Sequence, residues 1–216
     1  MIRYFDRPWH EVPLVVVDTE TTGTGPGDRA VQFGAVWFVC GEIADEFKSL
    51  VDPGISIPAE ATAIHGITDE MVRGMPTIEA ATSRLVHGSM LDESQLAAYN
   101  ADFDRGMLPR IGDGHWPWLD PLVLVRHVDR YAKGKGRHTL ATSCERHGIE
   151  MVGAHGALAD ARAAGKLLYK LGRDVWRDDT LGRVLRWTRE MQAKQWYDYH
   201  EWLSKQPTKE QSCQKT

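Results

Sequence analysis

Two carboxylates, Asp18 and Glu20, directly follow an uninterrupted apolar run, residues 14–17. A short β-branched run that ends in a glycine-rich stretch predicts a buried strand. Side chains at i and i+2 of a strand point to the same side, so the two carboxylates would repel each other unless a cation lay between them. Oxygen ligands suit Mg²⁺ or Mn²⁺ better than zinc. A hydrated pair of acids at a loop edge is the alternative.

Two further stretches hold polar residues where the chain is expected to enter a helix. "YNADFDRGML" contains Asn100 and Asp104, at the end of a short predicted strand. "HGALADARAA" contains His155 and Asp160, five residues apart around another helix start. Each stretch is a weak signal by itself, but their order along the chain makes the combination specific.

Together these stretches resemble the motifs of the DEDDh family, the DnaQ-like 3′–5′ exonucleases, in the branch of exonuclease X and the proofreading subunit epsilon of polymerase III. The shared pattern is Asp-x-Glu-Thr-Thr-Gly, then Asn-x-x-Phe-Asp, then His-x-x-x-x-Asp. "AIHGITDEMV" resembles another loop of the family, and "HTLATSCERHGI" resembles the helix before its third motif. The resemblance covers about residues 14–172 and implies an RNase H-like exonuclease fold.

The resemblance also implies a catalytic site with two Mg²⁺ ions, for which Mn²⁺ could substitute. In the family's arrangement Asp18 would bridge both ions, and Glu20 and Asp160 would hold the ion that activates water. Asp104 would support the cluster through bound waters. His155 would be the general base that takes a proton from the attacking water, a task that suits a neutral imidazole.

Three more residues acquire a role in substrate binding from the resemblance. The backbone around Thr21 would face the 3′-hydroxyl, and Asn100 would help to orient the second motif. His65 would stack on the terminal base or sugar, a contact that tolerates any sequence. A loop histidine exposed to water is the alternative for His65.

Some neighbouring residues need to be separated from this set. Asp102 lies two residues before Asp104, but the pattern selects Asp104 because it directly follows the phenylalanine. Asp120 is interpreted as the N-cap of the next helix. Tyr99 replaces a histidine that is common in the family, and Gln32 replaces a glutamate. We expect these two departures to alter the detailed properties of the site and to leave the activity in place.

The rest of the sequence predicts the elements that position these residues. Two strands should form a hairpin around Gly41–Glu42, and residues 54–68 should be mostly irregular. A short strand is expected to end at Asn100. Helices are expected after Thr68, over residues 77–87, after Asn100, over residues 121–131, after a capping Thr139, and over residues 157–171.

A hairpin followed by alternating strands and helices predicts an α/β domain with a mixed central sheet flanked by helices. We expect this exonuclease domain to occupy residues 1–173. Residues 174–216 should form a tryptophan-rich helical extension and a disordered polar tail. Its tryptophans are expected to pack on the catalytic domain or on a second copy; they are Trp176, Trp187, Trp196 and Trp202.

The composition of the 216 residues fits an ordinary globular protein, and its net charge of −4 has the wrong sign for a general electrostatic grip on nucleic acid. A local basic stretch, residues 126–137, could track phosphates or be a solvated loop. The sequence has no apolar run long enough for a membrane and no apparent secretory signal. Three widely spaced cysteines indicate a reducing compartment, so we expect a cytoplasmic protein without a membrane partner.

The most specific interpretation is a metal-dependent 3′–5′ exonuclease that releases nucleoside monophosphates from single-stranded or frayed DNA ends, in proofreading or DNA repair. One alternative is an exoribonuclease that trims RNA 3′ ends. Another is a non-catalytic subunit that holds a 3′ end or a polymerase. The expected partners are nucleic acid and a DNA polymerase, with a homodimer through the C-terminal extension as a further arrangement.

Overall fold

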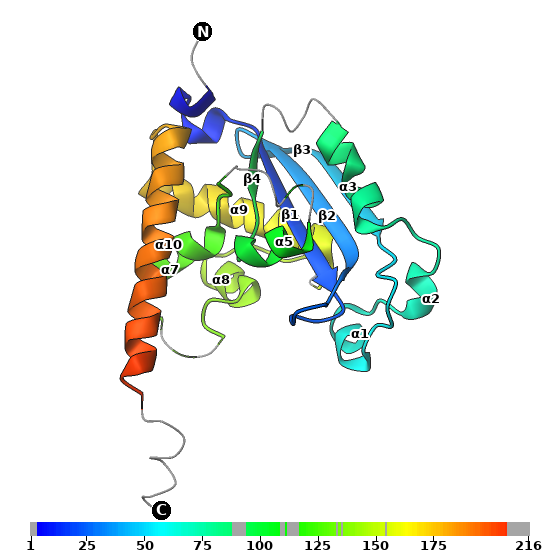
Figure 1. The fold of residues 1–216 in the computed structure, drawn as a ribbon. Coiled ribbons are helices and arrows are strands. Elements are labelled where there is room, and N and C mark those ends of the chain that lie inside the picture. The colour runs from blue at the N-terminus through cyan, green and yellow to red at the C-terminus, as the bar shows by residue number, and fades with distance from the viewer. Residues whose placement is uncertain are drawn as a thin grey trace, which may run out of the picture.

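The computed structural model describes residues 4–87, 94–108, 111, 117–132, 134, 136–153 and 155–206. Within these ranges the strands form one sheet in the order β3-β2-β1-β4 (Figure 1). The first three strands are antiparallel neighbours, and β4 pairs in parallel with β1. Their bounds are β1 (Leu14–Thr21), β2 (Ala30–Val39), β3 (Glu42–Leu50) and β4 (Gln95–Ala97). The predicted mixed sheet is therefore confirmed.

Most helices begin close to where the sequence predicts them, and Thr139 caps its helix by accepting a hydrogen bond from the Thr142 amide at 3.3 Å. The bounds are η1 (Tyr4–Asp6), η2 (Trp9–Glu11), α1 (Ala59–His65), α2 (Asp69–Val72), α3 (Ile78–His87), α5 (Ala101–Met107), α7 (Pro121–Val128), α8 (Leu140–Arg146), α9 (Ala157–Val175) and α10 (Leu181–Ser204).

The expectation of an irregular segment over residues 54–68 was wrong for its middle part, where α1 forms. Pro58 stands just before the first turn, a place where a missing backbone N–H costs nothing. Gly66 ends the helix in a left-handed conformation with φ of 74°. The proline and glycine therefore bound this helix instead of interrupting it.

The two faces of the sheet bury different sets of residues. Leu14 and Val16 of β1 belong to the cluster that packs against α7 and α9. Val15 and Val17 belong to the opposite cluster, which includes residues of α3 and α5. Because side chains alternate along a strand, Asp18 and Glu20 continue the face that meets α9.

Helix α9 and the sheet come into close contact at two points, and at each of them one side contributes a glycine. A Cβ atom added to Gly165 of α9 would lie 2.2 Å from the Phe38 ring on β2. A Cβ atom added to Gly34 of β2 would lie 2.5 Å from the carbonyl carbon of Ala157. An ion pair between Arg162 Nε and Glu46 Oε1 of β3, 2.7 Å apart, also connects the helix to the sheet. These contacts fix the position of the first half of α9.

The N-terminal segment and the start of α10 are joined by backbone contacts. Pro8 and Thr180 form an isolated antiparallel bridge, and the Trp9 amide donates to the Asp179 carbonyl at 3.0 Å. Along the first half of α10 a stripe of residues is buried, namely Leu181, Val184, Leu185 and Thr188. The first half of α10 thus packs on the body of the molecule (Figure 1).

The four tryptophans of the predicted extension lie in different environments. Trp176 is buried against Trp9, and Trp187 packs edge-to-face on Trp176. Trp196 and Trp202 are 62% and 55% exposed on the second half of α10. Helix α9 itself runs through residue 173 to Val175. The proposed division of the chain at residue 173 stays a prediction.

Some expectations concern residues outside the described ranges, namely the tail at residues 207–216 and the two lysines of the basic stretch, Lys133 and Lys135. Among the helices that the structure describes, none combines the length and apolar character that crossing a bilayer requires.

Candidate active site

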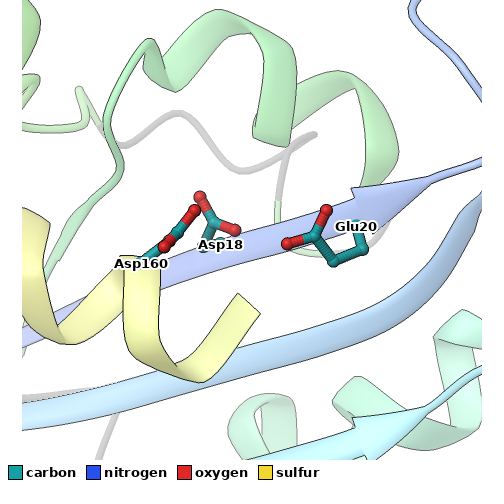
Figure 2. A group of neighbouring side chains, drawn as sticks. All are labelled: Asp18, Glu20 and Asp160. Carbon is teal, nitrogen blue, oxygen red and sulfur yellow. The ribbon is translucent and has the colours of Figure 1, made fainter. Parts of the chain in front are cut away.

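Three carboxylates meet where β1 passes the first turn of α9. Asp18 and Glu20 extend from β1, and Asp160 reaches them from α9 (Figure 2). One oxygen from each of these side chains lies within 4.8 Å of the others. The sequence predicted that these three residues belong to one site, and the structure places them together although 140 residues separate Glu20 from Asp160.

Asp104 of α5 is only 2% exposed and is close enough for its charge to act on Asp18, but it does not join the group of three carboxylates within 4.8 Å. Its Oδ1 accepts a hydrogen bond from the Thr19 hydroxyl at 2.8 Å. Thr19 stands between Asp18 and Glu20 in β1, so its side chain points to the opposite side of the strand. One strand thus presents two carboxylates and also orients a third, a role of Thr19 that its position between the two acids could have suggested.

The carboxylates repel one another in a poorly hydrated setting. Burial raises the pKa of Asp18 well above its usual value, and the charges of Asp104, Asp160 and Glu20 raise it further. Burial likewise raises the pKa of Glu20, of Asp160 and of Asp104, the last to about 7. Negative charge is therefore concentrated here, and Asp18 is the carboxyl on which the charges of the other three converge.

The oxygen atoms of this cluster fit a divalent cation. Asp160 Oδ1 is fully buried and has no hydrogen-bond partner among the described residues. A buried carboxylate oxygen without a partner is costly unless a cation or water compensates it. The donors are all oxygen atoms, which hard divalent cations prefer. The residues present are therefore suited to hold such an ion.

His155 stands at the exposed edge of the cluster, one residue before Gly156, the N-cap of α9. Its imidazole is close enough to oppose the raised pKa of both Glu20 and Asp160. Its φ of 65° lies in the left-handed region, which is uncommon for a residue other than glycine. This conformation places the histidine beside the acids and lets the chain turn into the helix.

His65 and Thr21 lie on another side of the site, at the carboxyl end of β1. The His65 Nδ1 accepts a hydrogen bond from the Ile67 amide at 3.0 Å, while its Nε2 is buried without a partner among the described residues. Burial lowers the pKa of His65, and the Thr21 backbone opposes this shift. His65 is therefore half-buried next to β1, which differs from the alternative of a solvated loop histidine.

The second motif is organised by a carboxylate whose full role the sequence did not indicate. Asp120 caps α7, as predicted, by accepting from the Leu122 amide at 2.8 Å. It also accepts from the amides of Asn100 and Ala101, at 3.0 and 3.2 Å. Asn100 has a left-handed conformation with φ of 65°. Asp120 thus holds the start of α5, and no local sequence pattern could reveal a partner twenty residues away.

Asp102 has a different environment from Asp104. Its side chain is 67% exposed and contacts Arg105 Nη1 at 3.3 Å. It also accepts a hydrogen bond from Gln192 of α10 at 2.9 Å. Of the two acids in this helix, Asp104 alone is buried toward β1.

The comparisons with known proteins agree with this geometry. Residues 15–168 match the family model described as "Exonuclease" (RNase_T). The chain is 32% identical over 181 residues to a PolC-type DNA polymerase III of Halalkalibacterium halodurans, a match that covers 81% of the chain and 12% of the relative. It is 39% identical over 177 residues to a DNA polymerase III subunit epsilon-like protein of Rhodobacter capsulatus, covering 77% of the chain and 24% of that relative.

Solved structures give the same result. The structure of exonuclease X in complex with 5′-overhanging duplex DNA matches with a TM-score of 0.66 and 26% identity, over 80% of this chain and 99% of that one. Exonuclease I, with 21% identity and a TM-score of 0.62 over 82% of this chain and 43% of that one, shares the fold. The chain spans only 12% and 24% of the two polymerase relatives, which are much longer proteins.

Proposed function

Because the chain belongs to the exonuclease family, in its DEDDh or DnaQ-like group with an RNase H-like fold, we propose that it hydrolyses phosphodiester bonds at the 3′ ends of DNA. The products are nucleoside monophosphates, released one at a time. The observation that carries this proposal is the group of carboxylates from β1 and α9 within 4.8 Å, beside the buried Asp104. A buried carboxylate oxygen without a partner supports a divalent cation in their midst.

The acidic residues Asp18, Glu20 and Asp160 would hold Mg²⁺, or Mn²⁺ in its place, with Asp104 as the supporting carboxylate. A bound pair of such ions would stabilise negative charge on the attacking and leaving oxygens of an in-line displacement. His155, at the exposed edge, accepts the proton of the attacking water. Thr21 and His65 would contact the terminal nucleotide, and Asn100, held by Asp120 through its amide, would help to orient the second motif.

DNA is the favoured substrate because the relatives are named as DNA polymerase III proteins and the exonuclease X structure contains duplex DNA. An RNA end-trimming enzyme and a non-catalytic subunit that holds a 3′ end are the alternatives. The three clustered carboxylates, with Asp104 and His155 near them, argue against the non-catalytic subunit. Degradation of single-stranded DNA, RNA of the same sequence, and matched and mismatched duplex ends would separate the three.

A DNA polymerase is the partner that these relatives suggest, and a homodimer through the exposed second half of α10 is the competing arrangement. The cytoplasm is the proposed location, because it is where a bacterial DNA polymerase partner of this kind would be met. Light scattering of the purified chain, alone and with a replicative polymerase, distinguishes the two arrangements.

Cleavage is expected to require a divalent cation. EDTA should abolish release of mononucleotides from a 5′-labelled single strand, and added Mg²⁺ or Mn²⁺ should restore it, because unpaired carboxylates would otherwise repel the scissile phosphate. A 3′-phosphate should block the reaction, since the site must accept a free terminal sugar. Full activity in EDTA, or release of products from the 5′ end, would contradict the proposed function.

His155→Asn is expected to lower kcat by about 10²–10⁴-fold, the range for the loss of a general base. Asparagine tolerates the left-handed backbone at this position, so the substitution removes the imidazole with little strain. Mn²⁺ binding should be retained. His200→Asn on the exposed face of α10 is the matched control and should remain within about twofold. A His155 variant as active as this control would remove the histidine from the mechanism.

A further inference from the structure

Gln32 of β2 makes a hydrogen bond with a residue that lies 125 positions later in the sequence. Its side chain is only 8% exposed, and its Oε1 accepts from the amide of Ala157 at 2.9 Å. Ala157 is the first residue of α9, and the N-cap residue, Gly156, has no side chain to accept from the first turn. The first amides of a helix have no partner within the helix. Gln32 therefore supplies a cap for α9 from another element.

This cap lies directly beside the acidic cluster. Gln32 is the antiparallel partner of Glu20, and Gly34 is the antiparallel partner of Asp18. Gly34 is also the residue at which α9 comes closest to the sheet, with Ala157 against its backbone. Two neighbouring positions of β2 thus hold Ala157 next to the two carboxylates of β1.

Asp160, the carboxylate that α9 contributes, lies three residues after Ala157. This is less than one helical turn of 3.6 residues. A shift of the first turn would therefore move the Asp160 carboxylate by a similar amount. Carboxylates that share a cation must stay within a few tenths of an ångström of the required geometry. The position of Ala157 consequently controls whether the three carboxylates are spaced correctly to coordinate an ion.

We propose that Gln32 is a positioning residue of the acidic cluster. Its amide oxygen fixes the first turn of α9 and so sets the separation between Asp160 and the carboxylates of β1. The amide is neutral, so it makes this contact without adding another negative charge beside Glu20, which a glutamate in this place would add. The connection to metal binding rests on the proposed function, whereas the connection to α9 does not.

Four variants of the full chain test the proposal. Gln32→Met keeps the length of the side chain and removes its strong acceptor, and Gln32→Asn keeps the polar group but withdraws it by one methylene. Gln32→Glu retains an acceptor at the same reach. Gln95→Met is the matched control, because Gln95 is also a buried glutamine of the sheet, bonded to the Pro117 carbonyl at 2.6 Å, but pairs with Leu14 at the opposite end of β1.

Amide hydrogen exchange of the metal-free protein provides the first measurement. In Gln32→Met and Gln32→Asn, exchange in the peptide that covers residues 155–163 should become about 10- to 100-fold faster, the effect of losing one buried hydrogen bond. Gln32→Glu and Gln95→Met should match the wild type in this peptide. Unchanged protection in both Gln32→Met and Gln32→Asn would overturn the proposal.

Mn²⁺ binding, followed by electron paramagnetic resonance without substrate, provides the second measurement. Gln32→Met should bind Mn²⁺ about 10- to 100-fold more weakly, as expected when the support of metal ligands is lost. Gln32→Glu and Gln95→Met should bind at least as well as the wild type. Equal weakening in Gln95→Met would indicate a general effect of stability, and equal weakening in Gln32→Glu would exclude the acceptor as the cause; either result overturns the proposal.

The two measurements also separate this inference from the proposed function. If the wild type bound no Mn²⁺, the proposed metal-dependent function would fail, while the exchange of residues 155–163 would still decide whether Gln32 holds α9. If the wild type bound Mn²⁺ and Gln32→Met did so equally well, the function would stand and the positioning role would fail.

Discussion

Asp104→Asn is expected to lower the rate of DNA cleavage by about 100-fold, the upper end of the range for groups that support metal ligands. The buried side chain meets Thr19 and adds to the negative field at Asp18, so its loss weakens both the charge and the order of the cluster. Asp102→Asn, at an exposed position of the same helix, should change the rate only a few-fold. Initial rates on a 5′-labelled oligonucleotide at saturating Mg²⁺ measure the difference, and the reverse ranking would mean that the second motif is assigned to the wrong acid.

The same substitution should have the opposite effect on the stability of the metal-free protein. Burial raises the pKa of Asp104 to about 7, so near pH 8 the folded state carries a carboxylate that it would hold more favourably as a neutral group. Asparagine is neutral at every pH. Because one pKa unit corresponds to about 1.4 kcal/mol, Asp104→Asn should raise the free energy of unfolding in EDTA by about 1–4 kcal/mol at pH 8.

The dependence on pH has a definite sign. A carboxyl whose folded pKa is raised binds its proton in the folded state at pH values where the unfolded chain has lost it, so folding is favoured as the pH falls. Wild type in EDTA should therefore melt at higher temperature as the pH decreases from about 8 to about 5, through the raised pKa of Asp104. The gain should be smaller in Asp104→Asn. A melting temperature that fell over this range in both proteins would contradict a raised pKa of the buried Asp104.

Gly34→Ala should reduce both stability and activity by a large amount. The added Cβ would meet the backbone of Ala157 and Leu158 at 2.5 Å, and backbone atoms cannot move aside by rotating a side chain. Overpacking of this kind costs about 1–3 kcal/mol, and relief requires the start of α9 to move away from β2. Asp160 would move with it, so cleavage should fall at temperatures where the variant is still folded.

Gly106→Ala is the matched control for this substitution. Gly106 lies in α5, next to the second motif, but a Cβ atom there would meet nothing within 4 Å. Removing glycine from a helix should stabilise the protein by about 0.5–1 kcal/mol and leave cleavage nearly unchanged. Chemical denaturation and rate assays on both variants make the comparison, and a Gly34→Ala protein as stable as wild type would show that α9 does not depend on this close contact.

Local patterns were enough to predict much of the scaffold. The apolar run before Asp18 predicted β1, the turn residues predicted the hairpin, and Thr139 and Asp120 were recognised as helix caps because capping needs only residues within the first turn. Helix α1 was missed because Pro58 and Gly66 are compatible both with a loop and with the two ends of a helix.

The arrangement of the site depended on information of another kind. That Asp18, Glu20, Asp104 and Asp160 belong together came from the order of family motifs and not from periodicity. The hydrogen bond between Gln32 and Ala157 spans 125 residues, and the register of β1 against β2 brings Gln32 beside Glu20. Neither follows from local propensity, because pairing between distant segments is decided by the packing of the whole domain.

The bridge between Pro8 and Thr180 has a consequence for the order in which the chain acquires its structure. During synthesis the N-terminal residues leave the ribosome first, but their backbone partners at residues 179–181 are translated about 170 residues later. Until then Trp9 lacks its ring contact with Trp176 and its backbone hydrogen bond to the Asp179 carbonyl, so its apolar indole is not yet fully buried. The sheet and its carboxylates can therefore assemble before residues 8–9 find these partners, and closure around Trp9 comes after the sheet has formed.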